Sequence, residues 1–448
     1  MDIGNRGKFG SRVGAVLVAA GSSVGLGNIW RFPYVMGENG GAAFLLIYIA
    51  CILFIGLPIM LGEFSVGRAT GKNSVGAYRS LDRRWTPLGY CGMIASFFIM
   101  GFYFVVASWT ADYLVCSISG ELTQYSTATE YQELFNNFIA SPWKLIGYTW
   151  VFLLATHVII YLGVNRGIER ISKILMPILF LILIVLSIKS LTMANSSEGL
   201  EFMFKPDFSK ITPSVVIQAL GQAFFSLSIA SGCLITYASY FNSKTNLRTT
   251  AVQVTLLDTF VALLSGIIIF PACFSVGVMP GVGEQLVFVT LPGIFNQMAG
   301  GMVWSTAFFL LLVIAALTST IAQHEVTTSY FIDEWHLTRP KAAVLSTVIV
   351  GVMASVAALS LSVWSGYRIF DMRVFDLFDK FTANILLPLG GFFTTIYVGW
   401  RMDRKLLLDQ LTNKGTLSVG IVNCVIFLLK YICPVMMMII FLDSIGLF

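Results

Sequence analysis

Residues 21–28 read Gly-Ser-Ser-Val-Gly-Leu-Gly-Asn and interrupt an apolar run that begins near residue 12. A helix in lipid must satisfy its own backbone hydrogen bonds, so clustered glycine, serine and asparagine at mid-membrane are expected only where irregular backbone lines a cavity. Residues 226–232, Ser-Leu-Ser-Ile-Ala-Ser-Gly, interrupt a later apolar run in the same way. Close packing of helices through small residues could explain one such cluster. Two clusters, five spans apart, favour two broken helices.

Interrupted helices at corresponding places in two halves of a chain are expected of transporters built from inverted repeats, which bind substrate and ions at the breaks. The free N–H groups and positive dipole end at a half-helix N-terminus favour an anion. Unwound backbone carbonyls suit a hard cation such as Na⁺. A site with both features would hold a carboxylate and sodium together, which describes an amino acid carried with Na⁺.

The composition of the whole chain indicates a membrane protein. Of its 448 residues, 56% are hydrophobic and 11% are charged, whereas soluble domains carry about 25% charged residues. At about 20 apolar residues per spanning helix, the length allows roughly ten to twelve spans and little else. Continuously apolar runs such as 178–186 exclude a transmembrane β-barrel, whose strands alternate. The formal charge of +5 is spread over short loops, so no nucleic-acid partner is expected.

Apolar runs bounded by charged residues, proline, glycine and asparagine predict an all-α membrane protein with eleven transmembrane helices. The predicted spans lie near 12–36, 41–67, 87–117, 146–163, 168–191, 213–240, 247–277, 302–333, 341–363, 377–400 and 417–446. We expect one transmembrane transporter domain over 1–448, a 5+5 inverted repeat in which the first and sixth helices are unwound. Repeat one covers about 12–191, repeat two about 213–400, and an extra helix about 417–446.

The distribution of positive charge predicts the orientation of the chain. Most of the 28 lysine and arginine residues fall in segments on the same side as the N-terminus. Cytoplasmic loops carry an excess of Lys and Arg. We therefore expect a multi-pass protein of the bacterial inner (cell) membrane, with the N-terminus in the cytoplasm and the C-terminus outside.

Signals for catalysis are weak. The three histidines, His157, His324 and His336, lie in different segments, and no GxSxG or HExxH motif occurs. The seven cysteines lie mostly within apolar runs, without a CxxC pair or histidine partners at metal spacing. We therefore predict that the chain is not an enzyme. Two other interpretations stay open: an amino-acid sensor without transport, and a carrier coupled to protons instead of sodium.

The first interrupted helix carries a specific family motif. Residues 25–34 read Gly-Leu-Gly-Asn-Ile-Trp-Arg-Phe-Pro-Tyr, and Glu-Asn-Gly-Gly follows at 38–41. The sequence resembles the neurotransmitter:sodium symporter family at these residues, and again at 167–170, 235–240 and 317–319. Ala42 and Ile47 depart from the family pattern, at positions that concern packing in the second span. An end after eleven spans resembles the bacterial amino acid carriers of the family, such as its leucine and hydrophobic amino acid carriers.

Carried over residue by residue, the resemblance implies two sodium sites built from oxygen donors, as a hard cation requires. The first would use the Ser23 carbonyl, the Asn28 side chain, Ser226 and Asp258, with the substrate carboxylate as a further ligand. The second would use the carbonyls of Gly21, Val24 and Ala315 and the hydroxyls of Thr318 and Ser319. For Thr318 and Ser319, the alternative is hydrogen bonding to the preceding helical turn.

Asp258 departs from the family in an informative way. Most members have asparagine at this position, and the animal members use a nearby chloride to balance the second sodium. A carboxylate inside the apolar run 254–270 is costly and is a functional candidate by default. We expect Asp258 to supply the negative charge itself, so that transport needs no chloride. Ala262, at the family's chloride-contacting position, has no hydroxyl to offer and agrees with this.

The resemblance also implies where the substrate binds. Its carboxylate would lie on the N–H groups of Leu26 and Gly27 and on the Tyr103 hydroxyl. Its amine would lie on the carbonyls of Ser22, Phe225 and Ser228, and its side chain among Ile99, Phe225, Ser231, Ser319 and Gln323. Monoamine carriers have an aspartate at the position of Gly25, so glycine here favours a substrate that brings its own carboxylate. We expect a neutral amino acid, either bulky and aromatic or small with ordered water.

Charged residues near the two ends of this path resemble the family's gates. Arg31 and Asp379, with Gln222 beside the arginine, match the outer gate above Phe225, and Asp376 is an alternative partner for Arg31. Arg6 and Asp333 match the inner pair. Gly167 and Pro177 resemble the family's helix-unwinding pair, and a proline inside a helix removes one backbone hydrogen bond. We expect this half-helix to open toward the cytoplasm.

Overall fold

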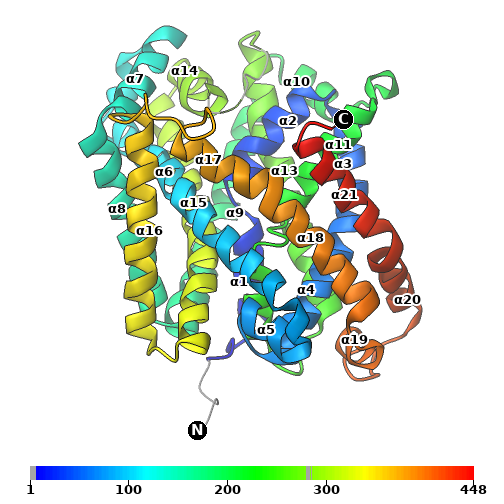
Figure 1. Cartoon of the computed structure of the whole chain (residues 1–448). Helices are drawn as coiled ribbons and strands as arrows, with labels where there is room; N and C mark the ends of the chain where they lie inside the picture. The colour runs from blue at the N-terminus through cyan, green and yellow to red at the C-terminus, as the bar shows by residue number, and fades with distance from the viewer. Residues whose placement is uncertain (1–6, 279–282, 284, 448) are drawn as a thin grey trace.

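The computed structural model describes residues 7–278, 283 and 285–447. Every regular element over these residues is helical, apart from one isolated bridge between Ile369 and Met372. The long helices run side by side between the two ends of the molecule (Figure 1), which is the arrangement that continuous apolar runs require in lipid. The predicted all-α membrane fold is confirmed.

Nine helical segments of the described chain are long and apolar enough to cross a membrane. They are Ala42–Thr70 (α3 Ala42–Cys51 and α4 Leu57–Thr70), Arg83–Ile118 (α6 Thr86–Ile118), Pro142–Tyr161 (α8), Val164–Leu191 (α9 Arg170–Leu191), Leu247–Ser275 (α13), Gly301–Glu334 (α15), Arg339–Leu361 (α16), Val374–Arg401 (α17 Val374–Phe381 and α18 Leu387–Ile396) and Gly420–Ser444 (α20 Gly420–Phe427 and α21 Cys433–Ser444). Each lies within a few residues of a predicted span.

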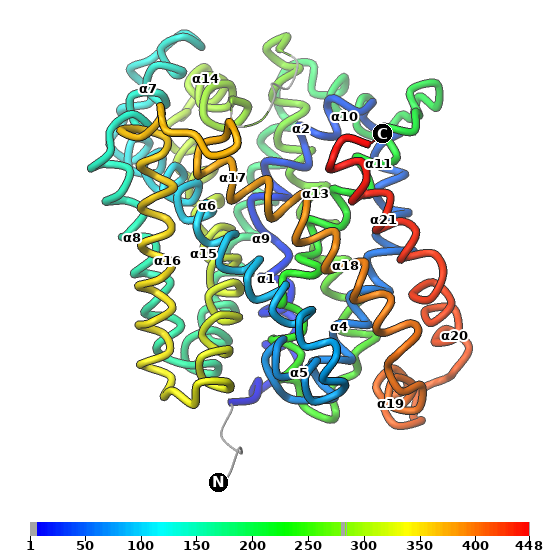
Figure 2. The backbone as a smooth tube through the Cα atoms, in the orientation of Figure 1, coloured from blue at the N-terminus to red at the C-terminus, as the bar shows by residue number. Residues whose placement is uncertain are grey.

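The first predicted span is broken where the sequence indicated. Helix α1, Arg12–Ser23, stops at Val24, and the chain resumes as Gly27–Glu38, which includes α2 (Phe32–Glu38). The two halves are bent by 55°, and together they form a tenth candidate span. Figure 2 shows the blue tube of this segment within the bundle. Helix α1 packs against α9, α13 and α15, so the break lies inside protein, as irregular backbone at membrane depth requires.

The sixth predicted span is broken as well. Helix α11, Pro213–Ser226, and helix α12, Cys233–Ala238, are separated by six non-helical residues. Ser228 and Ala230 adopt φ of 53° and 64° there, a left-handed conformation that costs about 1–3 kcal/mol each in a non-glycine residue. Two hydrogen bonds hold it: Ala230 N–H donates to Glu63 Oε1 at 2.9 Å, and Ser228 Oγ donates to the Ser22 carbonyl at 2.7 Å. With α11 and α12 taken as one span, the described helices match the eleven predicted segments, although the number of spans itself remains a prediction.

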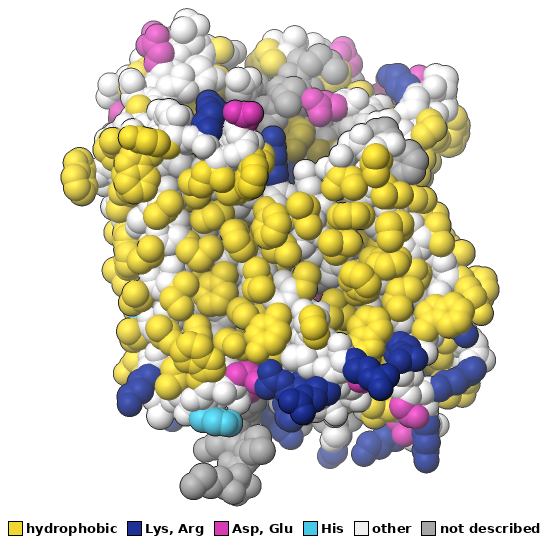
Figure 3. Space-filling model, in the orientation of Figure 1, with side chains coloured by type: hydrophobic (Ala, Val, Ile, Leu, Met, Phe, Trp, Pro, Cys, Tyr) yellow, Lys and Arg dark blue, Asp and Glu magenta, His cyan; other side chains and the backbone are white. Residues whose placement is uncertain are grey.

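Short helices outside the predicted spans cover the two ends of the bundle. Helices α7 (Ala128–Ala140), α10 (Ser196–Phe204) and α14 (Leu291–Asn296) lie at the upper end in Figure 1, and α5 (Ser74–Leu81) and α19 (Arg404–Leu411) lie at the lower end. A broad hydrophobic band covers the middle of the face shown in Figure 3, and lysine and arginine side chains gather along its lower rim. This surface matches a chain embedded in a bilayer.

Candidate functional site

The two broken spans meet at one buried polar cluster. The Asn28 amide donates to Asp258 Oδ1 at 2.7 Å and to Ser226 Oγ at 2.9 Å. Ser226 Oγ donates in turn to both carboxylate oxygens of Asp258, at 2.8 and 3.0 Å. Tyr48, from α3, adds its hydroxyl to Ser226 Oγ at 3.3 Å. Asn28, Ser226 and Asp258 are all buried, so three predicted ligands from three separate spans are brought together away from solvent.

The Asp258 carboxylate has only neutral partners in the described part of the chain. Its hydrogen bonds come from an amide and a hydroxyl, and no lysine or arginine of the described residues forms an ion pair with it. An ionised carboxylate buried without a cation is very costly. The surrounding carboxylate, hydroxyl and carbonyl oxygens are the donors that a hard cation prefers. The chemistry of this cluster therefore fits a bound cation.

Two predicted ligands have other partners in the structure. The Asn28 side-chain oxygen accepts the Gly25 N–H at 3.1 Å, and Ser23 Oγ donates to the Leu227 carbonyl at 3.4 Å. These contacts tie the end of α1 to the break between α11 and α12. The Asn28 side-chain oxygen would share its lone pairs with an ion, whereas the bond of Ser23 Oγ leaves the predicted ligand, the Ser23 carbonyl, unaffected.

The second predicted ion site brings the end of α1 against the middle of α15. Ser319 Oγ donates to the Val24 carbonyl at 3.4 Å. A Cβ atom on Gly21 would lie 3.4 Å from Thr318 Cβ, so these two backbones approach closely. Thr318 Oγ1 donates to the Ala315 carbonyl at 3.0 Å, the back-bonding that the sequence left open as an alternative. All five predicted groups of this site are therefore neighbours, and the Thr318 hydroxyl oxygen keeps lone pairs to offer.

A cavity of about 70 Å³ lies between the two breaks. Most of the predicted substrate-binding residues line it: Ser22, Ser23, Gly27, Ile99, Tyr103, Phe225, Ser226, Ser228, Ser231, Ser319 and Gln323. Leu26 does not line this cavity; its N–H donates to the Tyr103 hydroxyl at 3.3 Å, and the residue lines a second, adjoining space. A side chain on Gly25 would displace the Ser319 hydroxyl, because its Cβ would lie 2.5 Å from Ser319 Oγ.

A larger vestibule of about 460 Å³ opens above the cavity, and Phe225 separates the two spaces. The Arg31 guanidinium lies 4.5 Å from the centre of the Phe225 ring. Asp379 lines both spaces, but no ion pair joins it to Arg31 over the residues that the structure describes. Of the predicted outer gate, Arg31 therefore lies against the Phe225 ring, and Asp379 lines the same two spaces as Phe225.

Two other predicted gate residues are engaged elsewhere. Gln222 does not contact Arg31; its Nε2 donates to the Gly27 carbonyl at 3.2 Å. Asp376, the alternative partner for Arg31, forms an ion pair with Arg373 at 2.7 Å. Of the two carboxylates that line the vestibule, Asp376 is thus the one engaged with Arg373, and the pairing of Asp379 with Arg31 stays a prediction.

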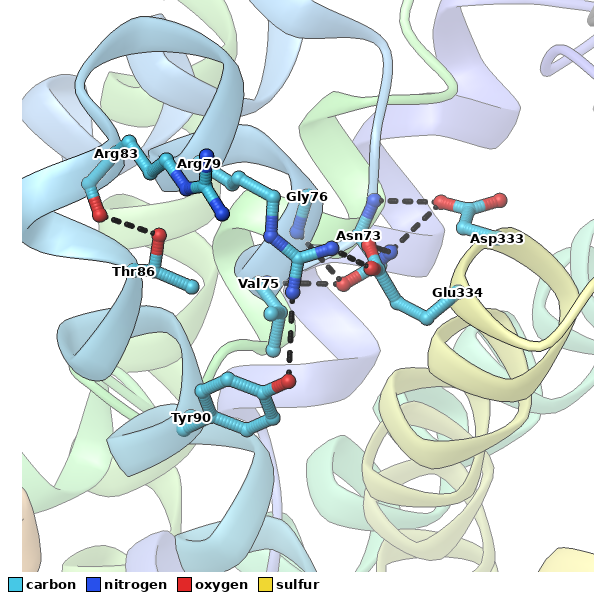
Figure 4. A network of polar contacts seen from close by, with 9 residues as sticks. All are labelled: Asn73, Val75, Gly76, Arg79, Arg83, Thr86, Tyr90, Asp333 and Glu334. Atoms are coloured by element: carbon cyan, nitrogen blue, oxygen red, sulfur yellow. Dashed lines mark hydrogen bonds and ion pairs between the residues drawn. The ribbon is translucent and has the colours of Figure 1, made fainter.

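At the opposite end, Asp333 belongs to a polar network between α15 and α5 (Figure 4). Its Oδ2 accepts the backbone and side-chain N–H groups of Asn73, at 2.8 and 2.9 Å. The neighbouring Glu334 pairs with Arg79, which also donates to the Tyr90 hydroxyl. Arg6, the predicted partner of Asp333, lies outside the described residues. This network holds α5 against the C-terminal end of α15.

The predicted unwinding pair lies in the N-terminal half of the fifth span, Val164–Leu191. Gly167 packs closely on the end of α8, since a Cβ there would lie 2.0 Å from the Ile159 carbonyl. Pro177 is inside α9. Glu169, between them, accepts the Gly10 N–H at 2.7 Å and the Ser11 hydroxyl at 3.0 Å. The start of α1 is thus fastened to the segment expected to open.

Three residues near the site were missed from the sequence. Glu63 could have been found, because a charged residue within an apolar span is a functional candidate. Tyr48 and Ser96 carry no such signal. Ser96 is fully buried on α6 and bonds to Gln323 and to the Ser231 carbonyl. Ser96 is brought to the site only by the packing of α6 against α15 and against the unwound segment.

Comparison with known proteins decides the family. A profile of the sodium:neurotransmitter symporter family matches residues 6–141 and 132–448. The chain belongs to this family. An uncharacterized sodium-dependent transporter of Bacillus subtilis (strain 168) is 35% identical over 442 residues, with 98% of each chain covered. The human sodium- and chloride-dependent GABA transporter 2 is 25% identical over 459 residues, which cover 91% of this chain and 75% of the relative.

A solved structure agrees with the sequence relatives. The crystal structure of MhsT in complex with L-phenylalanine superposes with a TM-score of 0.89 and 40% identity, covering 98% of this chain and 100% of that one. The chain is therefore a sodium-dependent transporter and an integral membrane protein. The prediction that it is not an enzyme is confirmed, because the family consists of transporters.

Proposed function

We propose that the chain is a symporter that imports a neutral L-amino acid with Na⁺ by alternating access. The observation that carries this proposal is the buried Asp258 carboxylate, which joins both broken spans and has only neutral partners in the described chain. A cation would offset its charge and connect Asn28, Ser226 and the substrate carboxylate in one site. Substrate and ion would then stabilise each other's binding.

Two sodium sites are proposed, the first at Asn28, Ser226 and Asp258 and the second where α1 meets Thr318 and Ser319. Two ions supply enough energy for accumulation. A tenfold gradient contributes about 1.4 kcal/mol per ion, and 100 mV about 2.3 kcal/mol per charge. Two ions therefore offer roughly 7 kcal/mol, enough for accumulation on the order of 10⁵-fold of a zwitterion.

Transport is proposed to be independent of chloride. Asp258 carries a permanent charge within the ion cluster, so a bound anion is not needed to balance the second sodium. Ala262 is fully buried and has no hydroxyl with which to hold an anion. Uptake that stops when chloride is replaced by gluconate would contradict this part of the proposal.

The substrate is proposed to bring its own carboxylate, to be bound near Gly27 and Tyr103. Gly25 leaves no room for an acidic side chain that would replace it, since even a Cβ would crowd Ser319. A bulky hydrophobic or aromatic amino acid is favoured because the similar structure holds L-phenylalanine. Cavity and vestibule adjoin at Phe225, so closure over the substrate can enlarge or reshape the smaller space.

The proposed cycle uses the two ends of the bundle. On the outer side, Arg31 and Asp379 approach across Phe225 to close the vestibule. On the inner side, separation of α5 from α15 at Asp333 and unwinding between Gly167 and Pro177 release the ions. The halves at about 12–191 and 213–400 are proposed to be the inverted repeats that make this motion symmetric. The basic lower rim is proposed to face the bacterial cytoplasm, with the N-terminus on that side.

The proposal is tested by uptake of radiolabelled amino acids into proteoliposomes with an inward sodium gradient. Uptake that requires sodium and exceeds equilibrium supports a symporter. Sodium-dependent binding without uptake would instead indicate a sensor. Uptake with choline in place of sodium, driven by an acidic exterior, would indicate coupling to protons.

A further inference from the structure

One wall of the cavity carries a side-chain amide that is hydrogen-bonded to a residue outside the cavity. Gln323 lines the cavity, and its Oε1 lies 2.8 Å from Ser96 Oγ. Ser96 Oγ also lies 2.7 Å from the Ser231 carbonyl, in the unwound segment. Ser96 itself is fully buried and does not line the cavity. Gln323 is therefore fixed at one end of its amide by Ser96, and the other end is left for the cavity that Gln323 lines.

The single hydroxyl hydrogen of Ser96 limits which atoms of the Gln323 amide are left to bind the substrate. A serine hydroxyl has one hydrogen and two lone pairs, so it cannot donate to two acceptors at full strength. When the hydrogen is on Gln323 Oε1, the two N–H donors of Nε2 are left for the cavity. When the hydrogen is on the Ser231 carbonyl, a half-turn of the amide lets Nε2 donate to Ser96 and leaves Oε1 for the cavity. In both arrangements one polar end of the amide faces the substrate.

A hydroxyl group matches both arrangements, because it donates one hydrogen and accepts through its lone pairs. An apolar side chain matches neither, since it would desolvate the open end of the amide without replacing its hydrogen bonds. The rest of the wall near Gln323 is mixed, with Ile99 and Ile229 beside Ser231 and Ser319. The hydroxyls of Ser231 and Ser319 already donate to the Ser228 and Val24 carbonyls, so the demand for a polar substrate side chain comes mainly from Gln323.

We propose that Gln323, oriented by Ser96, selects neutral amino acids whose side chain carries a hydroxyl over the matched side chain that lacks it. This inference rests on the proposed function, because it assumes that an amino acid occupies the cavity. Gln323 is the specificity-determining contact. Ser96 is a positioning residue, since it acts through Gln323 and does not touch the substrate.

The test compares two matched pairs, L-tyrosine with L-phenylalanine and L-threonine with L-valine. Each is used to displace a labelled amino acid from the purified full-length transporter in saturating sodium. In the pair that binds more tightly, we expect the hydroxyl-bearing member to bind roughly three- to tenfold tighter, the range of one net hydrogen bond. Equal or tighter binding of the apolar member would overturn the proposal. If no amino acid binds in sodium, the proposed function fails instead.

Variants of Gln323 and Ser96 distinguish the effect of losing the amide from a general loss of structure. Gln323→Met keeps the length of the side chain, and Ser96 keeps the Ser231 carbonyl as its acceptor, so no buried hydroxyl is orphaned. We expect the hydroxyl preference to fall to about onefold or to reverse, while sodium-dependent binding of the apolar member persists. Ser96→Ala should reduce the preference partially, because the amide stays but is no longer oriented.

Thr320→Val is the matched control on the same helix. Thr320 bonds to Thr156 at 3.0 Å and is buried, but it does not line the cavity. Replacing the Thr320 hydroxyl removes a polar contact one turn from Gln323 and should leave the affinity ratio of the hydroxyl-bearing to the apolar amino acid unchanged. A Gln323→Met protein that retains the full hydroxyl preference, or a Thr320→Val protein that loses it to the same extent, would overturn the assignment. Gln323→Leu gives a second apolar variant if the methionine protein does not fold.

Discussion

Replacement of Asp258 by asparagine removes a charge from the centre of the proposed ion cluster and changes little else. Asparagine has the same shape, and its Oδ1 can still accept the Asn28 amide, which lies 2.7 Å from Oδ1 in the wild type. Its Nδ2 can donate to Ser226 Oγ, which now donates to the carboxylate at 2.8 Å. The hydrogen bonds between the two broken spans can therefore survive while the negative charge is lost.

The expected effect follows from the electrostatic energy of one ion next to one carboxylate. Two unit charges about 4 Å apart interact by about 4 kcal/mol at the effective dielectric constant of a protein. A loss of that size corresponds to roughly a thousandfold in affinity. Asparagine keeps an oxygen ligand, so we expect the sodium half-saturation of Asp258→Asn to rise between about tenfold and a thousandfold. The thermal stability without sodium should rise, because a buried charge has been removed.

The assay is sodium-dependent binding of a labelled amino acid to the purified protein, titrated in sodium chloride and in sodium gluconate. Wild-type protein should give the same half-saturation in both salts. Asp207→Asn is the control for the chemical change, since Asp207 is exposed and caps a turn at Ser209. A half-saturation of Asp258→Asn within twofold of the wild type, or a wild type that needs chloride, would refute the reasoning.

Three further changes probe other parts of the molecule. Pro177→Ala should restore the backbone N–H donor that proline lacks inside α9 and slow inward release of substrate in proteoliposomes without abolishing binding from outside; unchanged turnover would contradict a role in opening. Gly25→Ala should displace the Ser319 hydroxyl, whose oxygen would lie 2.5 Å from the new Cβ, and weaken sodium-dependent thermal stabilisation; an unaltered sodium shift would contradict the crowding. Arg339→Met should leave buried Glu325 without its 2.5 Å ion pair and cost about 3–5 kcal/mol in urea unfolding, and Arg339→Met with Glu325→Gln should recover much of it. No recovery in the double variant would show that the arginine acts through packing.

Local pattern was enough to predict the helices and their breaks. Continuous apolar runs need a helix to satisfy their backbone in lipid, and the glycine and serine clusters at 21–28 and 226–232 mark where the helix cannot continue. The structure ends α1 at Ser23 and α11 at Ser226, inside those clusters. The short helices α7, α10 and α14 were not anticipated, because pieces of that length carry too little apolar surface to stand out.

The sequence by itself determined the membrane fold, the broken helices and, through the 25–34 motif, the family. Only the tertiary structure decided which groups meet. Asn28 and Asp258 are 230 positions apart, and no local spacing predicts that they lie 2.7 Å from each other. The same holds for Ser96 behind Gln323 and for the Arg31 guanidinium over Phe225. The physical reason is that hydrophobicity along the chain specifies which face of each helix is buried, whereas the pairing of polar atoms inside the bundle depends on how all the helices pack at once.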